Sequence, residues 1–275
     1  MADGFLHKNQ HRWAGQLVLE KFSRKVTVMG LRKDLFKLYW AVQRVIVPNL
    51  RYSQYLYEDV LKMNVRAETV WLDLGCGRRL LPEWRLEQEK LLVGSCKTIV
   101  GLDYDLPSLK DHQNISLKVR GSVCELPFGD GCFDLVTANM VVEHLDFPEI
   151  QFKDVLRILK RGGLFIFHTP NAVSYVTIVN RLVPETLKKK LIYVLDGRKE
   201  EDVFETHYKA NTARRISALA RLTGFEAVKI KMLVTSAAFA LVLPVAVAEL
   251  IWIRLLMTRP FKPLRTNIIA ILRKQ

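Results

Sequence analysis

The sequence predicts an α/β fold built on a doubly wound, mostly parallel sheet with helices on both faces. Three observations predict it. Short apolar segments alternate with helical segments, a Gly-x-Gly turn directly follows the first apolar segment, and the second apolar segment ends in an acidic residue. Alternating strands and helices favour parallel pairing, and such sheets bind ligands at the carboxyl ends of their strands.

The elements follow in chain order. Before the first strand, residues 51–63 have the composition of a helix. Pro82 suits a first helical position, the helix that opens at Pro148 ends at Arg-Gly-Gly, and a helix with an Asn/Thr start ends at Gly224. We expect strands at 70–74, 98–103, 115–120, 133–138, 164–169, 225–233 and 267–272, and helices at 82–92, 148–160 and 211–223.

The composition restricts the binding partners and the cellular compartment that we expect. The 275 residues carry a net charge of +14, which favours a polyanionic partner, either nucleic acid or an acidic membrane face, or else a solvated basic surface. The four cysteines, which form no CxxC pair, predict reduced thiols with neither a disulfide framework nor a metal site. No signal peptide is visible, so we expect a cytoplasmic chain.

The loop after the first strand, Asp73-Leu-Gly75-Cys76-Gly77, predicts a ligand close to the backbone. Glycines allow that approach because they carry no Cβ. Asp103 ends the second strand, where a carboxylate can accept both hydroxyls of a ribose. The loop is GxG rather than GxGxxG, and Asp103 follows Asp73 by 30 residues rather than about 20, so a nicotinamide dinucleotide is disfavoured.

Three further blocks follow in order: "GSVCELPFGDGCFDLVTANMVVEHL" (121–145), "VLRILKRGGLFIFHTPN" (155–171) and "RLTGFE". With them the chain resembles the class I S-adenosylmethionine-dependent methyltransferases, and most of all the branch that acts on quinones, small molecules or lipids. The resemblance covers about residues 52–233 and the last strand. It implies a Rossmann-like sheet with an antiparallel last strand, and S-adenosyl-L-methionine as cofactor.

The resemblance also implies a set of cofactor-binding residues. The first motif faces the methionine part, the acidic residue and its neighbour hold the ribose, the next block flanks the adenine, and an asparagine follows the fourth strand at the mouth of the site. In this sequence these are Asp73, Gly75, Cys76, Gly77, Asp103, Tyr104, Ser122, Val123 and Asn139.

The chain departs from the family pattern at two places. Ser122 stands where an acidic residue usually contacts the adenine amino group, and a hydroxyl is a weaker acceptor there. Arg78 and Arg79 replace the third glycine of the loop. One hypothesis is that an arginine binds the carboxylate of the cofactor. The alternative is that both point to solvent or to a membrane phosphate.

Three histidines are candidate general bases, because methyl transfer to oxygen is helped by a base that titrates near neutral pH. His144 follows the fourth strand beside Glu143, which could orient its ring or serve only a structural turn. His168 ends the fifth strand and faces either the ligand or the core. His207 lies before a helix, on the expected acceptor side.

Three additions to the core fold suggest a membrane. We expect a basic amphipathic extension over residues 1–50, and a methyltransferase domain over 51–275 with insertions at about 172–205 and 234–260. The extension either lies on an anionic membrane or packs on the domain. The first insertion is either a membrane-facing helix or a substrate cap.

The second insertion is strongly apolar, with no charge between Leu233 and Ala248. A single membrane span would place the last strand across the bilayer, and Pro244 would break a helix there. We therefore expect a re-entrant or interfacial helical hairpin. A buried dimer-forming helix pair and a lid over an apolar pocket remain the alternatives.

These features together predict a methyltransferase that O-methylates a hydrophobic or lipid-linked small molecule at an anionic membrane surface. An RNA methyltransferase is disfavoured, since no aromatic-basic RNA module occurs and no aromatic residue follows Asn139 closely. A non-catalytic membrane-associated scaffold is favoured by Arg79 and Ser122 and disfavoured by the intact Gly75, Gly77 and Asp103. The sequence gives no indication of the oligomeric state.

Overall fold

The computed structural model describes residues 34–183, 205–237 and 242–275. It divides into two compact units, a smaller one from residues up to Leu50 together with Ala237–Leu255, and a larger one from Arg51–Ser236 and Leu256–Gln275. Most of the basic extension, and the Lys188–Lys190 part of the first insertion, lie outside the described residues.

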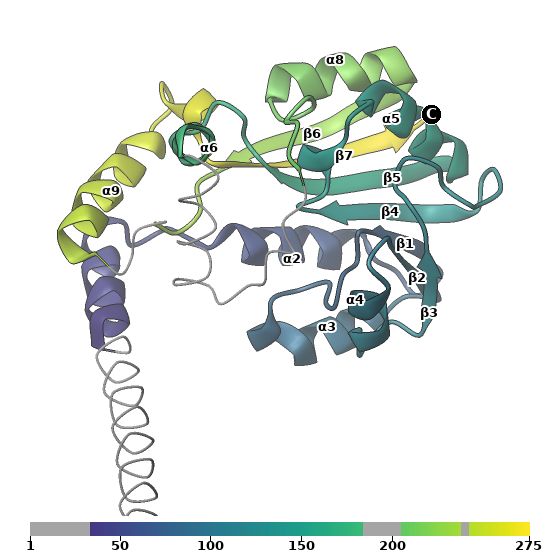
Figure 1. The fold of residues 1–275 in the computed structure, drawn as a ribbon, viewed down its shortest axis with the longest axis horizontal. Coiled ribbons are helices and arrows are strands. Elements are labelled where there is room, and N and C mark those ends of the chain that lie inside the picture. The colour runs from purple at the N-terminus through teal and green to yellow at the C-terminus, as the bar shows by residue number, and fades with distance from the viewer. Residues whose placement is uncertain (1–33, 184–204, 238–241) are drawn as a thin grey trace, which may run out of the picture. The chain divides into compact units, whose positions relative to one another are not determined.

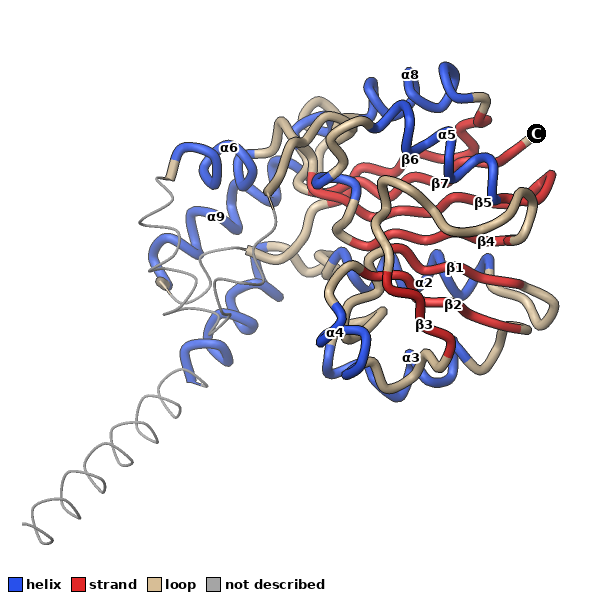
Figure 2. The backbone as a smooth tube through the Cα atoms, turned by 45° about the vertical axis from the view of Figure 1, so that its right-hand side comes forward, coloured by secondary structure: helices blue, strands red, loops and turns tan. Residues whose placement is uncertain are grey.

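The larger unit is built on a seven-stranded sheet with the order β3-β2-β1-β4-β5-β7-β6 (Figures 1 and 2). Strands β1 to β5 pair in parallel, whereas β7 runs antiparallel to both β5 and β6. This confirms the predicted fold class. The strands are β1 (Val70–Leu74), β2 (Thr98–Asp103), β3 (Leu117–Arg120), β4 (Phe133–Asn139), β5 (Leu159–Pro170), β6 (Phe225–Leu233) and β7 (Asn267–Lys274).

Helices cover both faces of this sheet. The helices α2 (Ser53–Asn64), α3 (Leu86–Val93) and α4 (Leu106–Asp111) bury apolar side chains against one face. The helices α5 (Pro148–Ile158) and α8 (Ala213–Thr223) do so against the other. The short helix α6 (Tyr175–Leu182) follows β5.

The two-residue period of the strands distributes side chains between these two cores. On β5, Phe165 and Phe167 pack around Phe152 of α5, with ring centroids 5.4 and 5.8 Å away. Ile166, between them, belongs to the core on the opposite face. A strand buried on both faces reads as a continuous apolar run, which is why "LFIF" was recognisable in the sequence.

Some element boundaries differ from those predicted. Pro82 precedes a 3-10 turn (Glu83–Arg85), and α3 begins only at Leu86. Helix α5 ends at Ile158, because Leu159 is already extended and pairs with Phe133, so the Arg-Gly-Gly stretch belongs to β5. The predicted limits of α8 are closely matched: Thr212 caps it by accepting a hydrogen bond from the Arg215 N–H at 3.1 Å, and Gly224, at φ +94°, ends it.

The smaller unit pairs the helix of residues 34–46 with α9 (Leu243–Leu256). The Tyr39 hydroxyl accepts a hydrogen bond from the Ala237 N–H at 3.1 Å, and Arg254 donates to the Ile46 carbonyl at 3.4 Å. Pro244 lies in the first turn of α9, where no intrahelical hydrogen bond is lost. Among the described helices none has the length and apolarity that crossing a bilayer requires.

Candidate active site

The loop after β1 has the backbone shape that only glycine adopts readily. Gly75 and Gly77 lie at φ +63° and +52°. The N–H groups of Gly75 and Cys76 donate to the Leu102 carbonyl of β2 at 2.7 and 3.2 Å. A Cβ on Gly75 would lie 2.5 Å from Val141 Cγ2, whereas a Cβ on Gly77 would meet nothing within 4 Å. The side of Gly77 that a Cβ would occupy is therefore open, so a ligand could approach the backbone there.

Asp103 holds this loop to the end of β2. One carboxylate oxygen accepts from the Gly77 N–H and the other from the Asp105 N–H, both at 2.8 Å. A carboxylate offers about four lone-pair positions, so about two remain for two ribose hydroxyls. Tyr104, next in sequence, is 66% exposed, and the Arg120 guanidinium lies 5.8 Å from its ring centroid. These residues fit the adenosine part of the implied cofactor.

Asp73 lies beneath the loop and is almost fully buried. Its carboxylate accepts a hydrogen bond from Thr137 at 2.5 Å, and the Thr137 hydroxyl accepts one from the Trp71 indole at 2.7 Å. Burial, with the nearby negative charges of Glu89 and Asp103, raises the pKa of Asp73 to about 7. The Asp73 side chain thus links the end of β1 to β4 directly before the loop.

The remaining residues around the loop are placed as follows. The buried Cys76 thiol packs towards Gly101. Ser122 is exposed, and its hydroxyl accepts from the Cys124 N–H at 3.1 Å. Each loop arginine has an acidic neighbour: Arg78 lies 3.7 Å from Asp111, and Arg79 lies 3.0 Å from Glu83. Binding of a cofactor carboxylate by these arginines stays a prediction.

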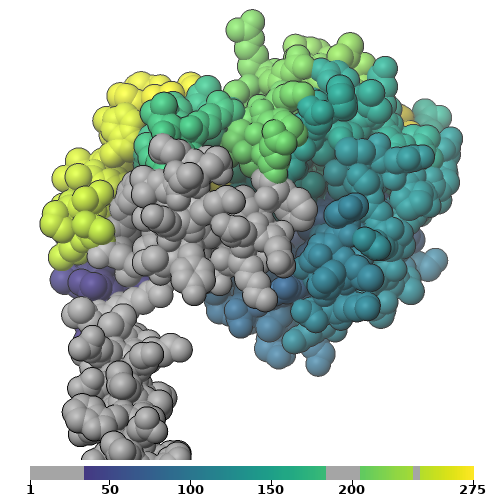
Figure 3. All heavy atoms as spheres, in the orientation of Figure 1, coloured from purple at the N-terminus to yellow at the C-terminus, as the bar shows by residue number. Residues whose placement is uncertain are grey.

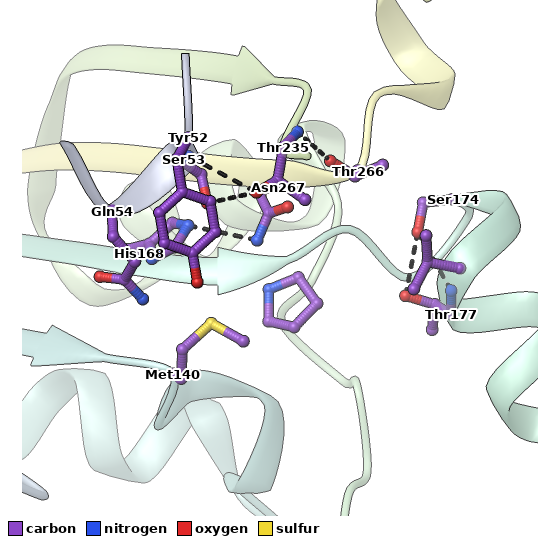
Figure 4. A pocket seen from close by; sticks show the side chains of 12 residues that line it. Tyr52, Ser53, Gln54, Met140, His168, Ser174, Thr177, Thr235, Thr266 and Asn267 are labelled. Atoms are coloured by element: carbon purple, nitrogen blue, oxygen red, sulfur yellow. Dashed lines mark hydrogen bonds between the residues drawn. The ribbon is translucent and has the colours of Figure 1, made fainter. Parts of the chain in front are cut away.

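A pocket of about 210 Å³ opens beside the carboxyl ends of β4 and β5 and the start of β7 (Figure 4). Its lining combines hydroxyl, amide and apolar side chains, and none of them carries a charge except through protonation of the single histidine. The lining residues are Tyr52, Ser53, Gln54, Met140, His168, Pro170, Ser174, Val176, Thr177, Thr235, Thr266 and Asn267.

A chain of hydrogen bonds links this pocket to the loop after β1. The Gln54 and Asn139 amides pair reciprocally at 3.3 and 2.9 Å, and the Asn139 amide nitrogen also lies 3.5 Å from the Leu80 carbonyl. His168 Nδ1 lies 2.9 Å from Asn139 Oδ1. Asn139 therefore contacts both the segment after β1, at Leu80, and Gln54 of the pocket lining.

His168 is buried as a neutral ring. The Asn267 amide nitrogen, a donor, lies 3.2 Å from His168 Nε2, so Nε2 is the acceptor and Nδ1 carries the proton. Burial lowers the pKa of His168 to about 3, and the ring stacks on Tyr57 with centroids 5.6 Å apart. Acting as a base would require His168 to release one of these partners.

Met140 has an uncommon backbone conformation for a residue with a side chain. It lies at φ +59° directly after β4, and its N–H donates to the His168 carbonyl at 2.8 Å. Such strain is typically retained at functional sites. It places the Met140 side chain at the pocket in Figure 4.

The other two candidate histidines lie around the turn after Met140. His144 Nδ1 lies 2.6 Å from the Glu205 carbonyl, and the His207 N–H donates to the Glu143 carbonyl at 2.8 Å. The Glu143 carboxylate accepts from the Thr169 hydroxyl at 2.9 Å, so its resolved partner is on β5 rather than the His144 ring. Of the three histidines, His168 is the one that lines the pocket, and the basic role of each stays a prediction.

Burial raises the pKa of Glu143 to about 7. Its neutral form stabilises the fold fully below the unfolded pKa near 4.5, and this contribution is lost as the pH rises through about 7. Glu143→Gln cannot ionise at this position. Between about pH 5 and pH 8 the wild type should therefore lose on the order of 3 kcal/mol of unfolding free energy that the variant keeps. Urea unfolding at both pH values measures this. Equal pH dependence in Glu143→Gln and in the exposed control Glu226→Gln would contradict it.

Sequence reasoning missed several residues of this site. Gln54, Thr235 and Asn267 line the pocket, and Thr137 braces Asp73. Met140 was read only as part of the stretch after Asn139. A detectable signal was the run of polar residues where β7 begins, since the amino end of an antiparallel strand lies beside the carboxyl ends of its parallel neighbours.

Known proteins match this part of the chain. Residues 72–167 match the family model of a methyltransferase domain. A Mycolicibacterium smegmatis protein named "Probable S-adenosylmethionine-dependent methyltransferase" is 28% identical over 109 residues, which cover 38% of this chain and 39% of the relative. A demethylmenaquinone methyltransferase of Staphylococcus saprophyticus is 31% identical over 112 residues, 38% of this chain and 46% of the relative. The chain thus spans less than half the length of these curated relatives.

A solved S-adenosylmethionine-dependent methyltransferase from Mesorhizobium loti has the same fold, with a TM-score of 0.51, 16% identity and coverage of 78% of this chain and 96% of that one. The sheet order, the glycine loop held by Asp103 and the family match agree with one another. The chain therefore contains a methyltransferase domain of this fold, and its S-adenosylmethionine-dependent relatives support S-adenosyl-L-methionine as its cofactor.

Proposed function

We propose that this chain transfers the methyl group of S-adenosylmethionine to a hydroxyl oxygen of an uncharged acceptor in the pocket of Figure 4. The observation that carries the proposal is the link through Asn139, whose amide contacts Gln54 of the pocket and the Leu80 carbonyl of the cofactor loop. An acceptor bonded to Gln54 would thus lie close to the ligand held by Gly77 and Asp103.

The lining supports the acceptor class. A carboxylate or phosphate in a half-enclosed pocket needs a cationic partner, and a buried unpaired charge is strongly unfavourable. Here the polar groups are hydroxyls and amides, among them Ser53 and Thr235, whose oxygens lie 3.2 Å apart. The volume of about 210 Å³ is smaller than a typical ligand pocket of about 300–1,000 Å³. It suits a single ring or the reacting end of a longer hydrophobic or lipid-linked molecule.

The chain mainly positions the reactants. Bound S-adenosylmethionine would supply a methyl group on a sulfonium and would leave as a neutral thioether, while the acceptor hydroxyl would lose its proton to a base or to water. Gly75, Gly77 and Asp103 would fix the donor, and Gln54 and Asn139 would orient the acceptor. The candidates for accepting the proton are His168, which lines the pocket but would have to release Asn267 from Nε2, and His144 and His207, which lie outside the pocket lining.

We further propose that the reaction takes place at a membrane surface. Several Staphylococcus relatives are named for demethylmenaquinone, which supports a quinone-like, hydrophobic acceptor. Such acceptors partition into membranes. The apolar segment of α9 and the net charge of +14 support the same location.

The proposal is tested by incubating the full chain with methyl-labelled S-adenosylmethionine and with lipid and phenol extracts, and by locating the label in the product. Gln54→Ala should lower turnover by about tenfold, the value of one lost hydrogen bond, while S-adenosylhomocysteine still binds. Gln88→Ala on α3, outside the pocket, is the matched control. Label on carbon or nitrogen would contradict O-methylation. No transfer by a chain that binds neither form of the cofactor would favour the scaffold alternative.

A further inference from the structure

Helix α9 has no polar face. Its charged side chains are Glu249, which is buried, and Arg254, at the C-terminal end. The inward side chains Ala246, Leu250, Ile253 and Leu256 are fully buried. The opposite side is also apolar and exposed, with Ile251 at 58%, and Figure 3 shows α9 side chains at the molecular surface. A surface helix normally turns polar residues outward, so this outward side is suited to a non-aqueous environment.

The helix of residues 34–46, in the same unit, also exposes large apolar side chains, here beside charged ones. Tyr39 and Gln43 are buried, whereas Leu38, Trp40 and Val45 are 47%, 45% and 80% exposed. Two neighbouring helices therefore expose large apolar side chains. Single exposed apolar residues need no explanation, but several on each of two paired helices do.

The charges beside these side chains are mostly basic. Lys37, Arg44 and Arg254 are exposed, against the exposed acid Asp34 in the described part of this unit. Pairing this unit with a second copy would bring like charges together, whereas an anionic lipid surface would attract them. The charge therefore favours lipid headgroups over self-association.

We propose that the outward side of α9 inserts into the interfacial layer of an anionic bilayer. The inserted residues of α9 would be Pro244, Val245, Ala248, Ile251 and Leu255, joined by Leu38 and Val45, which lie seven residues apart on one side of the helix of residues 34–46. At 1.5 Å per residue, α9 is about 21 Å long, short of the ~30 Å hydrocarbon core, so it lies in the interface rather than spanning it. The inference rests on the membrane location proposed above, for which it supplies the docking surface. It does not rest on the proposed methyltransferase chemistry.

Sedimentation of the full chain with phosphatidylcholine vesicles, with and without phosphatidylglycerol, tests this proposal. The wild type should sediment with the anionic vesicles, and less so in high salt. Ile251→Asp should weaken this binding by about tenfold or more, because it replaces an apolar contact with the lipid by a charge. Leu222→Asp is the matched control, since Leu222 on α8 is 63% exposed and the charge change is the same. It should bind vesicles like the wild type.

Equal vesicle binding by Ile251→Asp and Leu222→Asp would overturn the proposal, and so would a wild type that does not bind vesicles. A wild-type dimer in analytical ultracentrifugation that Ile251→Asp converts to a monomer, without vesicle binding, would assign the surface to a second copy. S-adenosylhomocysteine binding by Ile251→Asp separates the two proposals. If Ile251→Asp keeps S-adenosylhomocysteine binding but loses vesicle binding, docking is supported independently of the methyltransferase chemistry. A wild type that binds vesicles but not the cofactor would support docking and contradict the proposed methyltransferase activity.

Discussion

Asp103→Ala should abolish the stabilisation of the chain by S-adenosylhomocysteine. Its carboxylate accepts the Gly77 and Asp105 N–H groups and keeps lone pairs for a ribose. Losing hydrogen bonds to a charged acceptor costs about 1.5–3 kcal/mol each, so the affinity should fall by about 100-fold or more. A ligand at 100 times its Kd raises the unfolding free energy by about 2.7 kcal/mol, which thermal unfolding detects readily.

The matched control is Asp111→Ala on α4. Asp111 is exposed and contacts Arg78 at 3.7 Å, so the variant removes an acidic side chain from the same region and leaves the Gly77 contact intact. It should respond to S-adenosylhomocysteine like the wild type. If Asp103→Ala kept the full ligand-induced shift, the assignment of the ribose site to Asp103 would be wrong.

Gly75→Ala and Gly77→Ala should differ in their main effect, one on stability and the other on cofactor affinity. Both positions have positive φ, so each variant is strained by about 1–2 kcal/mol. At Gly75 the new Cβ would also meet Val141 at 2.5 Å, adding about 1–3 kcal/mol of overpacking. At Gly77 the Cβ enters open space on the ligand side. Gly75→Ala should therefore mainly lose stability, and Gly77→Ala mainly cofactor affinity, by about tenfold or more.

Urea unfolding and cofactor titration of the two variants separate these effects. Each variant is the control for the other, because both add one methyl group to the same loop. Equal cofactor affinity in Gly77→Ala and the wild type would show that the ligand does not approach Gly77. An undiminished unfolding free energy in Gly75→Ala would show that Val141 moves aside freely.

The sheet was predictable because its signals are local. The strand 225–233 matches the prediction residue for residue, and Gly224 marks its start through a positive φ. The start of β5 was not predictable in the same way. Leu159 joins the sheet by pairing with Phe133, a contact between segments that no local pattern displays. Similarly, Pro82 permits a helix start, but α3 begins at Leu86 after a 3-10 turn.

The cofactor loop was predictable for the same reason, since Gly75, Gly77 and Asp103 belong to short motifs. The pocket of Figure 4 was not. Its lining comes from the starts of α2, α6 and β7, the ends of β4 and β5, and the segments after β6 and before β7, and polar residues such as Gln54 and Asn267 belong to no motif. His168 was identified from its place at a strand end, but its neutral state depends on Asn139 and Asn267, which are distant in sequence.

Calorimetric titration of the full, detergent-solubilised chain with S-adenosylmethionine and S-adenosylhomocysteine tests the central claim most directly. A loop built from Gly75, Gly77 and Asp103 predicts one site per chain, with micromolar affinity for both ligands. Absence of binding heat from a chain that unfolds cooperatively, and is therefore folded, would contradict the claim.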